Sequence, residues 1–501
     1  MVVMKFGRFL LRHWLWVALA AALIFLALTL LIGAGQSVWF DEAYSVILAK
    51  SSPPRLLALT AADAHPPLFY LLLKIWGSLG NFNDLWLRLF SGLCATGAIF
   101  LSLLLARKCF GRRAALAAAP ILLLSPFVMR YGFEIRMYAL AALLAVAATY
   151  ILALAVQKSS RKLWVGYGVL VALGMLTLNY LAFVFLAHLI WLIMRRRAAK
   201  PAVKIWREPW FKAYVLAVIL YLPWLPFAVS QIFNSVASGG VMTDFGPTAV
   251  ARLASYWFVY SPEFSLNAWQ GLLVVLAAVA AIYLVVRARR LASANIKSYF
   301  NLLIIIVATP LAVMAVLSLA VPGGFFMERY TAHFAPLFYL LVGASAGVVL
   351  AKSPRGRVWH ALLYALLIGT LAVGVVNLSY YGNYNFQRLR ANSAQEIARS
   401  LGNCAPGRTV VADDAQTYFE LAHYLPNCGN LYFYYPHELT GAYRLLEGSA
   451  QRLENQPVAT AELVVVDEQN APTPPYVRQN NYRLVKTDER FRPIIIKTYA
   501  K

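Results

Sequence analysis

Residues 10–32 read LLRHWLWVALAAALIFLALTLLI, an apolar run of 23 residues whose only ionisable side chains, Arg12 and His13, stand near its start. A helix needs about 20 apolar residues to cross the hydrocarbon core of a bilayer, so this run is long enough to span. It is also longer than the apolar core of a cleavable signal peptide. We therefore expect a retained membrane helix at the start of the chain.

Similar apolar runs recur along most of the sequence. The chain has 501 residues, of which 61% are hydrophobic and 13% charged, whereas soluble domains carry about 25% charged residues. This composition excludes a soluble globule, and the long apolar runs with only four cysteines exclude a disordered chain or a disulfide scaffold. About eleven membrane helices are predicted, at residues 10–32, 88–106, 114–130, 138–156, 163–178, 181–194, 212–230, 267–286, 300–320, 332–351 and 358–377.

The formal net charge of +24 is a topology signal rather than a nucleic-acid signal. Lys and Arg concentrate in alternate connections, counted from the N-terminus, while every acidic residue of the membrane part except Glu208 lies in the other connections. The positive-inside rule then places the N-terminus in the cytoplasm of a multi-pass plasma (inner) membrane protein. Basic stretches interleaved with stacking aromatics, which a nucleic-acid groove would need, do not occur in the sequence.

We expect two domains, a transmembrane domain over residues 1–377 and an external domain over residues 378–501. An odd number of spans puts the tail on the periplasmic or extracellular side, where Cys404 and Cys428 are expected to form a disulfide. Cys94 and Cys109 are expected to be reduced. The tail is predicted to be a small α/β domain, with strands at 409–412, 431–435, 463–466 and 493–499 and helices at 415–424 and 442–454.

The first external loop, about residues 33–88, is long for a membrane bundle and contains VWFDEAYS at residues 38–45. Asp41 and Glu42 follow a span closely, and two carboxylates near lipid are costly unless they meet cations, a metal ion or water. A solvated loop start that happens to be acidic is the simpler alternative. Trp39, Phe40 and Tyr44 could stack on a sugar ring.

The same loop contains DAHPPLFY at residues 63–70. Pro66 and Pro67 favour the start of a helix over residues 68–80, which is too short to span and amphipathic enough to lie along the outer leaflet. The prolines do not explain His65, which can carry a proton, bind a metal ion or serve as an ordinary structural hydrogen-bonding group.

Two clusters of arginine and tyrosine are predicted at the external membrane boundary. The first, RYGFEIRMY at residues 130–138, includes Arg130, Arg136 and Tyr138, and the second is Glu328-Arg329-Tyr330. A guanidinium binds phosphate as a planar fork and stays charged in a poor dielectric, so these arginines suit a lipid-borne phosphate. The alternative is that arginine–glutamate pairs anchor the helix ends.

The order of these motifs resembles the bacterial branch of the protein O-mannosyltransferase and aminoarabinose transferase superfamily, integral-membrane glycosyltransferases of the C-type fold. The resemblance is strongest over residues 38–156, weaker to about residue 350, and absent from the tail. It rests on Asp41-Glu42, His65-Pro66-Pro67, Leu87-Arg88-Leu89, Phe110-Gly111-Arg112, Arg136-Met137-Tyr138 and Glu328-Arg329-Tyr330.

The resemblance implies inverting transfer of a sugar from a polyprenyl-phosphate donor to a lipid, glycan or protein acceptor of the cell envelope. It also implies that Asp41 is the catalytic base, with Glu42 beside it. Arg329 and Arg136, with Arg130 in reserve, are expected to bind the donor phosphate. The expected substrate-binding residues are His65, Tyr44, Tyr138 and Tyr330, and a divalent metal ion, with Glu42 and His65 as candidate ligands, is left open.

Two other classes of function remain in view. A transporter or flippase of a lipid-linked saccharide would be expected to place charges and broken helices near mid-membrane, often in two related halves. Here the acids cluster in one external loop, although Asn179, Pro223 and Pro226 interrupt apolar runs. The second class is a non-catalytic envelope protein whose tail binds a partner and functions without the Asp41 loop.

Overall fold

The computed structural model describes residues 9, 11–199, 203–237, 245–261, 267–320, 324–382, 394–402, 407–453 and 460–501. It divides into two compact units. Unit 1 comprises residues up to Gly33 with 64–69 and 85–380, and unit 2 comprises 34–63, 70–84 and 381–501. The long first loop, which the sequence analysis assigned to the membrane domain, therefore groups mostly with the tail.

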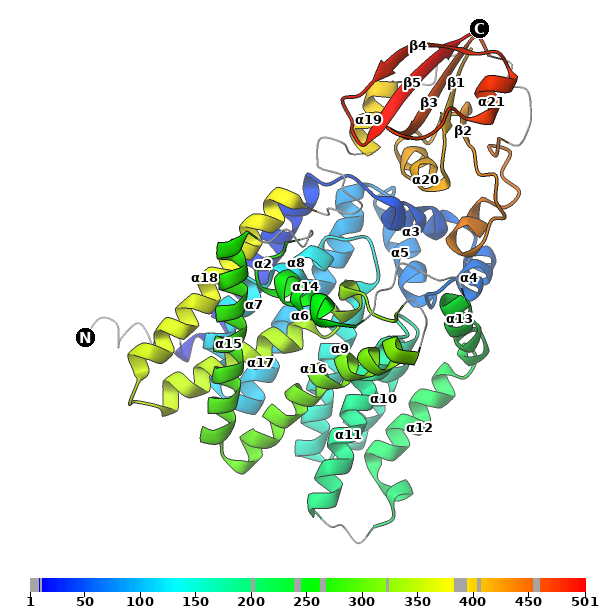
Figure 1. Ribbon diagram of the computed structural model, residues 1–501. Helices are drawn as coiled ribbons and strands as arrows, with labels where there is room; N and C mark the ends of the chain where they lie inside the picture. The colour runs from blue at the N-terminus through cyan, green and yellow to red at the C-terminus, as the bar shows by residue number, and fades with distance from the viewer. Residues whose placement is uncertain are drawn as a thin grey trace. The chain divides into compact units, whose positions relative to one another are not determined.

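Unit 1 is a bundle of helices (Figure 1). Within the described residues, seven helices are long and apolar enough to cross a membrane, or up to nine if two bent pairs each count as one span. The seven are α2 (Trp14–Ala34), α6 (Asp84–Phe110), α9 (Tyr138–Lys158), α15 (Ala268–Leu291), α16 (Ala294–Ala320), α17 (Ala335–Lys352) and α18 (Arg357–Tyr381).

Each bent pair breaks next to a proline. Helix α7 (Arg112–Leu123) meets α8 (Pro126–Gly132) at 62°, and α12 (Pro209–Tyr221) meets α13 (Leu225–Ala237) at 79°. Proline removes a backbone donor and restricts the preceding residue, so the chain turns there. Pro126 starts α8, and Pro223 lies in the break between α12 and α13.

The predicted count of about eleven spans is not confirmed. The difference lies in α10 (Arg161–Met175) and α11 (Leu181–Ala199). With 15 residues α10 is shorter than the hydrocarbon core is thick. Helix α11 contains Arg195, Arg196 and Arg197 near its end, of which Arg196 and Arg197 lie in its last turn. The polytopic helical class itself is confirmed.

Small residues let the helices of the bundle approach closely. A Cβ atom added to Gly343 on α17 would lie 2.6 Å from the Cα of Ala118 on α7, and one added to Gly347 would lie 2.6 Å from the Cα of Ala114. Small side chains four residues apart are how membrane helices gain contact when no hydrophobic effect drives them together. This contact fixes the α7–α8 segment that leads into the Arg130–Tyr138 connection.

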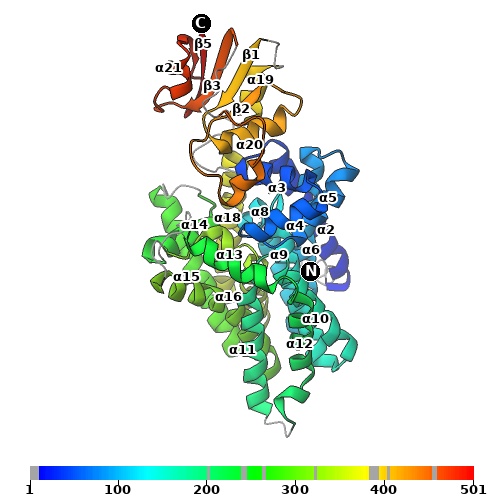
Figure 2. The same cartoon turned by 90° about the vertical axis from the view of Figure 1, so that its right-hand side faces the viewer.

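Unit 2 contains the helical loop segments and the small α/β domain of the tail. The loop forms α3 (Phe40–Lys50), α4 (Pro53–Ala62) and most of α5 (Leu68–Leu79). The five-stranded sheet has the order β2-β1-β3-β5-β4. Figure 1 labels all five strands, and Figure 2 shows the sheet from another side with β1, β2, β3 and β5 labelled. Its strands are β1 (Arg408–Ala412), β2 (Leu431–Phe433), β3 (Glu462–Glu468), β4 (Arg483–Asp488) and β5 (Ile494–Ala500), accompanied by α19 (Ala394–Leu401), α20 (Ala415–Tyr424) and α21 (Pro475–Gln479).

Strand β1 pairs in parallel with β2 and β3, whereas β5 pairs antiparallel with β3 and β4. The predicted α/β character of the tail is thus confirmed, and the helix predicted over 415–424 matches α20. The helical stretch predicted over 442–454 is too long within the described residues, because a 3₁₀ helix, η4 (Gly441–Leu446), is followed there by turns. Gly448 has a φ of +72°, which breaks a helix there.

Candidate functional site

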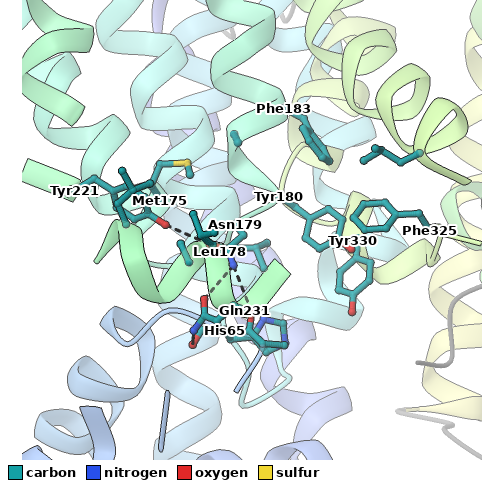
Figure 3. Close-up of a pocket in the computed structure, with 16 residues that line it drawn as sticks. His65, Met175, Leu178, Asn179, Tyr180, Phe183, Tyr221, Gln231, Phe325 and Tyr330 are labelled. Carbon is teal, nitrogen blue, oxygen red and sulfur yellow. Dashed lines mark hydrogen bonds between the residues drawn. The ribbon is translucent and has the colours of Figure 1, made fainter. Parts of the chain in front are cut away.

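A cavity of about 300 Å³ lies inside unit 1 (Figure 3). Apolar and aromatic side chains from several helices form most of its wall, including Phe183, Leu317 and Phe325. His65, Asn179 and Gln231 contribute the polar groups. A mainly apolar cavity with a few polar groups suits a ligand with a long hydrocarbon part and a small polar part.

Hydrogen bonds join the polar groups of the cavity wall. The side-chain amide of Asn179 donates to Gln231 Oε1 at 3.2 Å and to the carbonyl of Ala64 at 3.4 Å, while Gln231 Nε2 donates to the carbonyl of His65 at 3.4 Å. Gln231 is fully buried. These bonds hold the backbone at the start of the His-Pro-Pro motif against Asn179 of the α10–α11 connection and Gln231 of α13. The backbone of His65 is thereby fixed in position.

His65 lies within electrostatic reach of two of the predicted phosphate-binding arginines. Removal from water, together with the charges of Arg136 and Arg329, lowers the pKa of His65 well below its ordinary value. Its imidazole is therefore neutral near pH 7 and offers one N–H donor without adding a third positive charge.

Tyr138 and Tyr330 belong to the same cluster. Tyr138 is 1% exposed and interacts electrostatically with Arg329, Arg136 and Tyr330. The ring of Tyr330 lies 5.7 Å from the Arg329 guanidinium carbon and contributes to the cavity wall. The structure thus brings together five sequence-predicted site residues in unit 1: His65, Arg136, Tyr138, Arg329 and Tyr330.

Arg130, the reserve phosphate ligand, is engaged in a buried ion pair. Its Nη1 lies 3.2 Å from Glu134 Oε2, and both side chains are almost fully buried. Arg130 also hydrogen-bonds with Tyr260 and lies over the ring of Phe133. The Arg130 guanidinium thus neutralises the buried Glu134 carboxylate, which leaves less of its positive charge available to a donor phosphate.

Tyr180 also contributes to the cavity wall, although no sequence pattern predicted it. Its ring stacks on Tyr330 with the centroids 4.2 Å apart and on Phe325 with the centroids 5.7 Å apart. Tyr180 follows Asn179, which was noticed only as a polar point in an apolar run. An aromatic residue inside an apolar stretch gives no pattern that separates a cavity wall from ordinary core.

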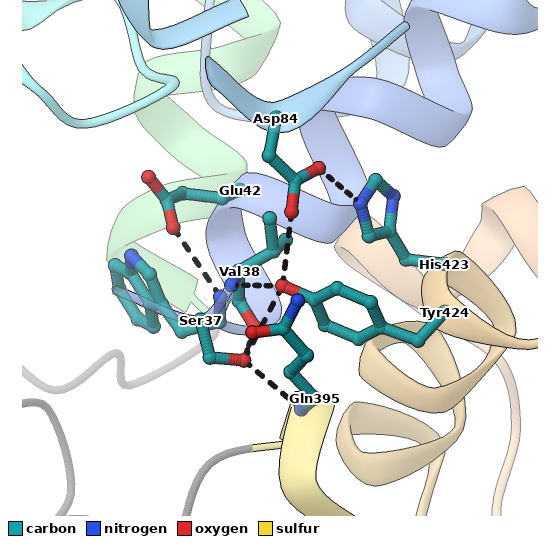
Figure 4. A network of polar contacts seen from close by, with 8 residues as sticks. Ser37, Val38, Glu42, Asp84, Gln395, His423 and Tyr424 are labelled. Atoms are coloured by element: carbon teal, nitrogen blue, oxygen red, sulfur yellow. Dashed lines mark hydrogen bonds and ion pairs between the residues drawn. The ribbon is translucent and has the colours of Figure 1, made fainter. Parts of the chain in front are cut away.

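The predicted base and its neighbour lie in unit 2, in the first turn of α3. Asp41 is partly exposed, whereas Glu42 is fully buried and its Oε2 accepts the N–H of Trp39 at 3.3 Å (Figure 4). Glu42 therefore caps the first turn of its own helix, which gives its carboxylate a structural role. The Tyr44 hydroxyl donates to Asp63 Oδ2 at 3.0 Å, which ties α3 to the end of α4.

Across the part of the chain that the structure describes, three or more His, Cys, Asp or Glu side chains do not gather as a metal ion would require. Cys428 is disulfide-bonded and Cys94 and Cys109 are free thiols, while Cys404 lies outside the described residues.

Comparison with known proteins agrees with this architecture. The family model for dolichyl-phosphate-mannose-protein mannosyltransferases matches residues 64–227. A comparison with curated protein sequences finds no significant match.

Among solved structures, apo ArnT from Cupriavidus metallidurans superposes with a TM-score of 0.61 at 12% identity, over 97% of this chain and 98% of that one. The same protein bound to undecaprenyl phosphate gives a TM-score of 0.57 at 13% identity, with the same coverage.

The fold is thus that of a polytopic membrane protein with a C-type glycosyltransferase architecture and a small α/β tail domain. The match to the mannosyltransferase family model is limited to residues 64–227, while the likeness in fold to ArnT extends over 97% of this chain.

Proposed function

We propose that this protein transfers a sugar from a polyprenyl-phosphate donor to an acceptor on the external face of the plasma membrane. The observation that carries the proposal is the cavity of unit 1, which is mainly apolar yet includes His65, a residue within electrostatic reach of Arg136 and Arg329. A polyprenyl phosphate combines the same two properties, a long hydrocarbon chain and an anionic head group.

The arginine cluster suits the departing group of this reaction. When the bond between the sugar and the phosphate breaks, the phosphate gains negative charge, and guanidinium groups stabilise that charge without a proton transfer. The neutral imidazole of His65 can donate one hydrogen bond to the same phosphate. Tyr138 and Tyr330 lie beside the guanidinium groups and complete the polar side of the donor site.

Asp41 takes the role of general base in this proposal. The acceptor hydroxyl gives its proton to the Asp41 carboxylate, its oxygen bonds to the anomeric carbon, and the bond from that carbon to the phosphate oxygen breaks. Polyprenyl phosphate leaves with the bonding electrons, and attack from the opposite side inverts the anomeric configuration. Glu42 supports the turn that carries Asp41, because its carboxylate accepts the N–H of Trp39.

The topology follows from the charge distribution. We place the N-terminus in the cytoplasm and the tail domain outside, since basic residues favour the cytoplasmic connections. Nine spans and eleven spans are both odd numbers, so either count puts the ends of the membrane part on opposite sides. The acceptor class is a lipid, a glycan or a protein of the cell envelope.

A binding experiment tests the donor assignment. The purified full-length protein in detergent is titrated with undecaprenyl phosphate and, as a matched control, with undecaprenol, which lacks the phosphate. Charge-assisted hydrogen bonds contribute about 1.5–3 kcal/mol each, so the phosphate should bind roughly ten- to a hundredfold more tightly. Equal affinity for the two lipids would remove the arginine cluster from the donor site.

A second measurement separates transfer from transport. Cells that lack the protein should accumulate a polyprenyl-phosphate sugar on the external leaflet, with its sugar–phosphate bond intact. Accumulation on the cytoplasmic leaflet would instead support a flippase and contradict the proposal.

A further inference from the structure

The start of helix α3 is capped by the tail domain. Phe40, the first residue of α3 and the neighbour of Asp41, donates its backbone N–H to Glu420 Oε1 on α20 at 2.9 Å. The N-cap residue Trp39 has an apolar side chain and provides no side-chain cap of its own. Because first-turn N–H groups need acceptors, a carboxylate 380 positions further along the chain satisfies one of them.

Two further side chains of α20 hold the segment that leads into α3 (Figure 4). The Tyr424 hydroxyl accepts the N–H of Val38 at 2.7 Å and donates to Asp84 Oδ2 at 3.1 Å. The other oxygen of Asp84 lies 2.6 Å from His423 Nε2. Adjacent residues of the tail therefore fix the entry to α3 and the first residue of α6 at the same time.

Ring contacts add a third constraint on α3. Phe419 packs edge-on against Phe40, with centroids 5.6 Å apart, and against Tyr44, with centroids 6.3 Å apart. Tyr44 lies one helical turn beyond Phe40, so the two contacts restrict rotation of α3 about its own axis.

Helix α20 is itself held by the sheet. Tyr418 packs on Phe433 of β2, with centroids 4.8 Å apart, and Leu421 is fully buried. Glu420 is 4% exposed, and a carboxylate is costly at such burial unless hydrogen bonds and a helix N-terminus compensate. A neutral side chain could fill the same space without that cost, so the charge is best explained by what it does for α3.

We propose that Glu420 and Tyr424 are positioning residues that set the location of Asp41, and that the tail domain is thereby a working part of the transferase. This inference rests on the proposed role of Asp41 as the base. A general base must be held within a fraction of an ångström of its productive position, and displacement by about 1 Å can cost a hundredfold in rate. The tail supplies that precision through the backbone next to Asp41.

The test compares Glu420→Ala, Glu420→Gln and the control Glu447→Ala in the full-length protein. Glu447 is an acidic residue of the same domain whose side chain is 61% exposed. We expect Glu420→Ala to lower kcat by about ten- to a hundredfold while the affinity for undecaprenyl phosphate stays unchanged. Glu420→Gln keeps an acceptor oxygen and should recover most of the rate, and the control should match wild type.

A double variant separates this inference from the proposed function. If Glu420 acts through Asp41, adding Glu420→Ala to Asp41→Asn should change the residual rate no further, because the positioned group is already disabled. Additive losses, or a lower Tm with unchanged kcat per folded molecule, would overturn the positioning role. Full activity in Asp41→Asn would refute the base assignment itself, whatever Glu420→Ala does.

Discussion

Tyr180 stacks face to face on Tyr330, with the ring centroids 4.2 Å apart and the planes inclined by 12°. Tyr180 stands just before α11, and Tyr330 belongs to the 3₁₀ helix η2 (Glu328–Thr331), next to Arg329. Phe325 also stacks on Tyr180, with the ring centroids 5.7 Å apart. The connection between α10 and α11 therefore braces the short segment that carries the proposed phosphate ligand.

Tyr180→Ala should weaken undecaprenyl phosphate binding by about two- to tenfold, because a stacked aromatic pair contributes about 0.5–1.5 kcal/mol beyond its buried area. Tyr180→Phe keeps the ring and should bind like wild type. The matched control is Tyr283→Ala, which removes from α15 an aromatic ring that stacks on His360 of α18. Unchanged affinity in Tyr180→Ala, measured per folded molecule, would show that η2 needs no such brace.

Arg329 is expected to contribute more than Tyr180. Its guanidinium lies within electrostatic reach of His65 and Tyr138, two other residues of the proposed donor site. Arg329→Ala should therefore weaken donor binding by roughly tenfold or more and slow transfer. Arg329→Lys should recover only part of both, because an ammonium lacks the two-pronged geometry of a guanidinium.

The control for Arg329 is Arg355→Ala, which removes an exposed guanidinium between α17 and α18. Affinity is measured by titration and stability by thermal unfolding in detergent. If Arg329→Ala lowers only the Tm and leaves donor affinity per folded molecule intact, Arg329 is a structural anchor and not a phosphate ligand.

The paired acids of α3 should differ in their effect on turnover. Asp41→Asn preserves shape but cannot accept a proton, so the rate should fall by roughly 10²–10⁴ while folding and donor binding persist. Glu42→Gln should cost less, since the amide oxygen can still accept the N–H of Trp39. Single-turnover rates in the two variants decide between them, and a larger loss in Glu42→Gln would exchange the two roles.

The membrane part shows what hydropathy can and cannot predict. Apolar runs located the helices of unit 1, because length and apolarity are the physical requirements of a span. The bends at Pro126 and Pro223 depend on local backbone geometry, so the runs 114–130 and 212–230 were read as single helices. The clustering of His65 with Arg136 and Arg329 was proposed from family motifs, since no local pattern brings residues so distant in sequence together.

Strands of the tail could be predicted from the sequence where an apolar run is buried in the sheet. Strands β1 and β3 carry valine runs and are buried, whereas β4 is exposed along most of its length and was missed. Its stability comes from pairing with β5, a non-local contact. The capping of α3 by Glu420 is also non-local, which is why sequence analysis treated the loop and the tail as separate.

The pKa of His65 should rise when the donor phosphate binds. Burial and the charges of Arg136 and Arg329 lower its pKa in the free protein, and a phosphate anion placed among these groups would raise it. The ¹³Cε1 resonance of His65, assigned with His65→Asn, should therefore show a neutral ring at pH 6.5 without ligand. Adding undecaprenyl phosphate should move its titration upward. Undecaprenol should leave it in place, and an identical shift with both lipids would contradict a phosphate next to His65.

Asp413 gives the tail domain a pH-dependent stability. It directly follows β1, and its Oδ1 accepts the Tyr476 hydroxyl at 3.1 Å. Burial, reinforced by the charge of Asp467, raises the pKa of Asp413 to about 7. An unfolded chain titrates its aspartates near pH 4, so between about pH 4 and pH 7 the folded domain binds the extra proton. The contribution of Asp413 to stability is thus complete below that window and is lost as the pH rises through it.

Hydrogen exchange of β1 and β3 in the full-length protein measures this effect. Protection of these amides should fall between pH 5 and pH 8 after correction for the intrinsic exchange rate. Asp413→Asn keeps an acceptor for Tyr476 but cannot ionise, so it should be more protected than wild type at pH 8 and similar at pH 5. Asp488→Asn is the control, because the Arg490 hydrogen bond lowers the pKa of Asp488 and that carboxylate stays ionised throughout. If wild type and Asp413→Asn keep the same difference in protection at every pH, Asp413 is already ionised in the folded domain at pH 5 and its pKa is not raised.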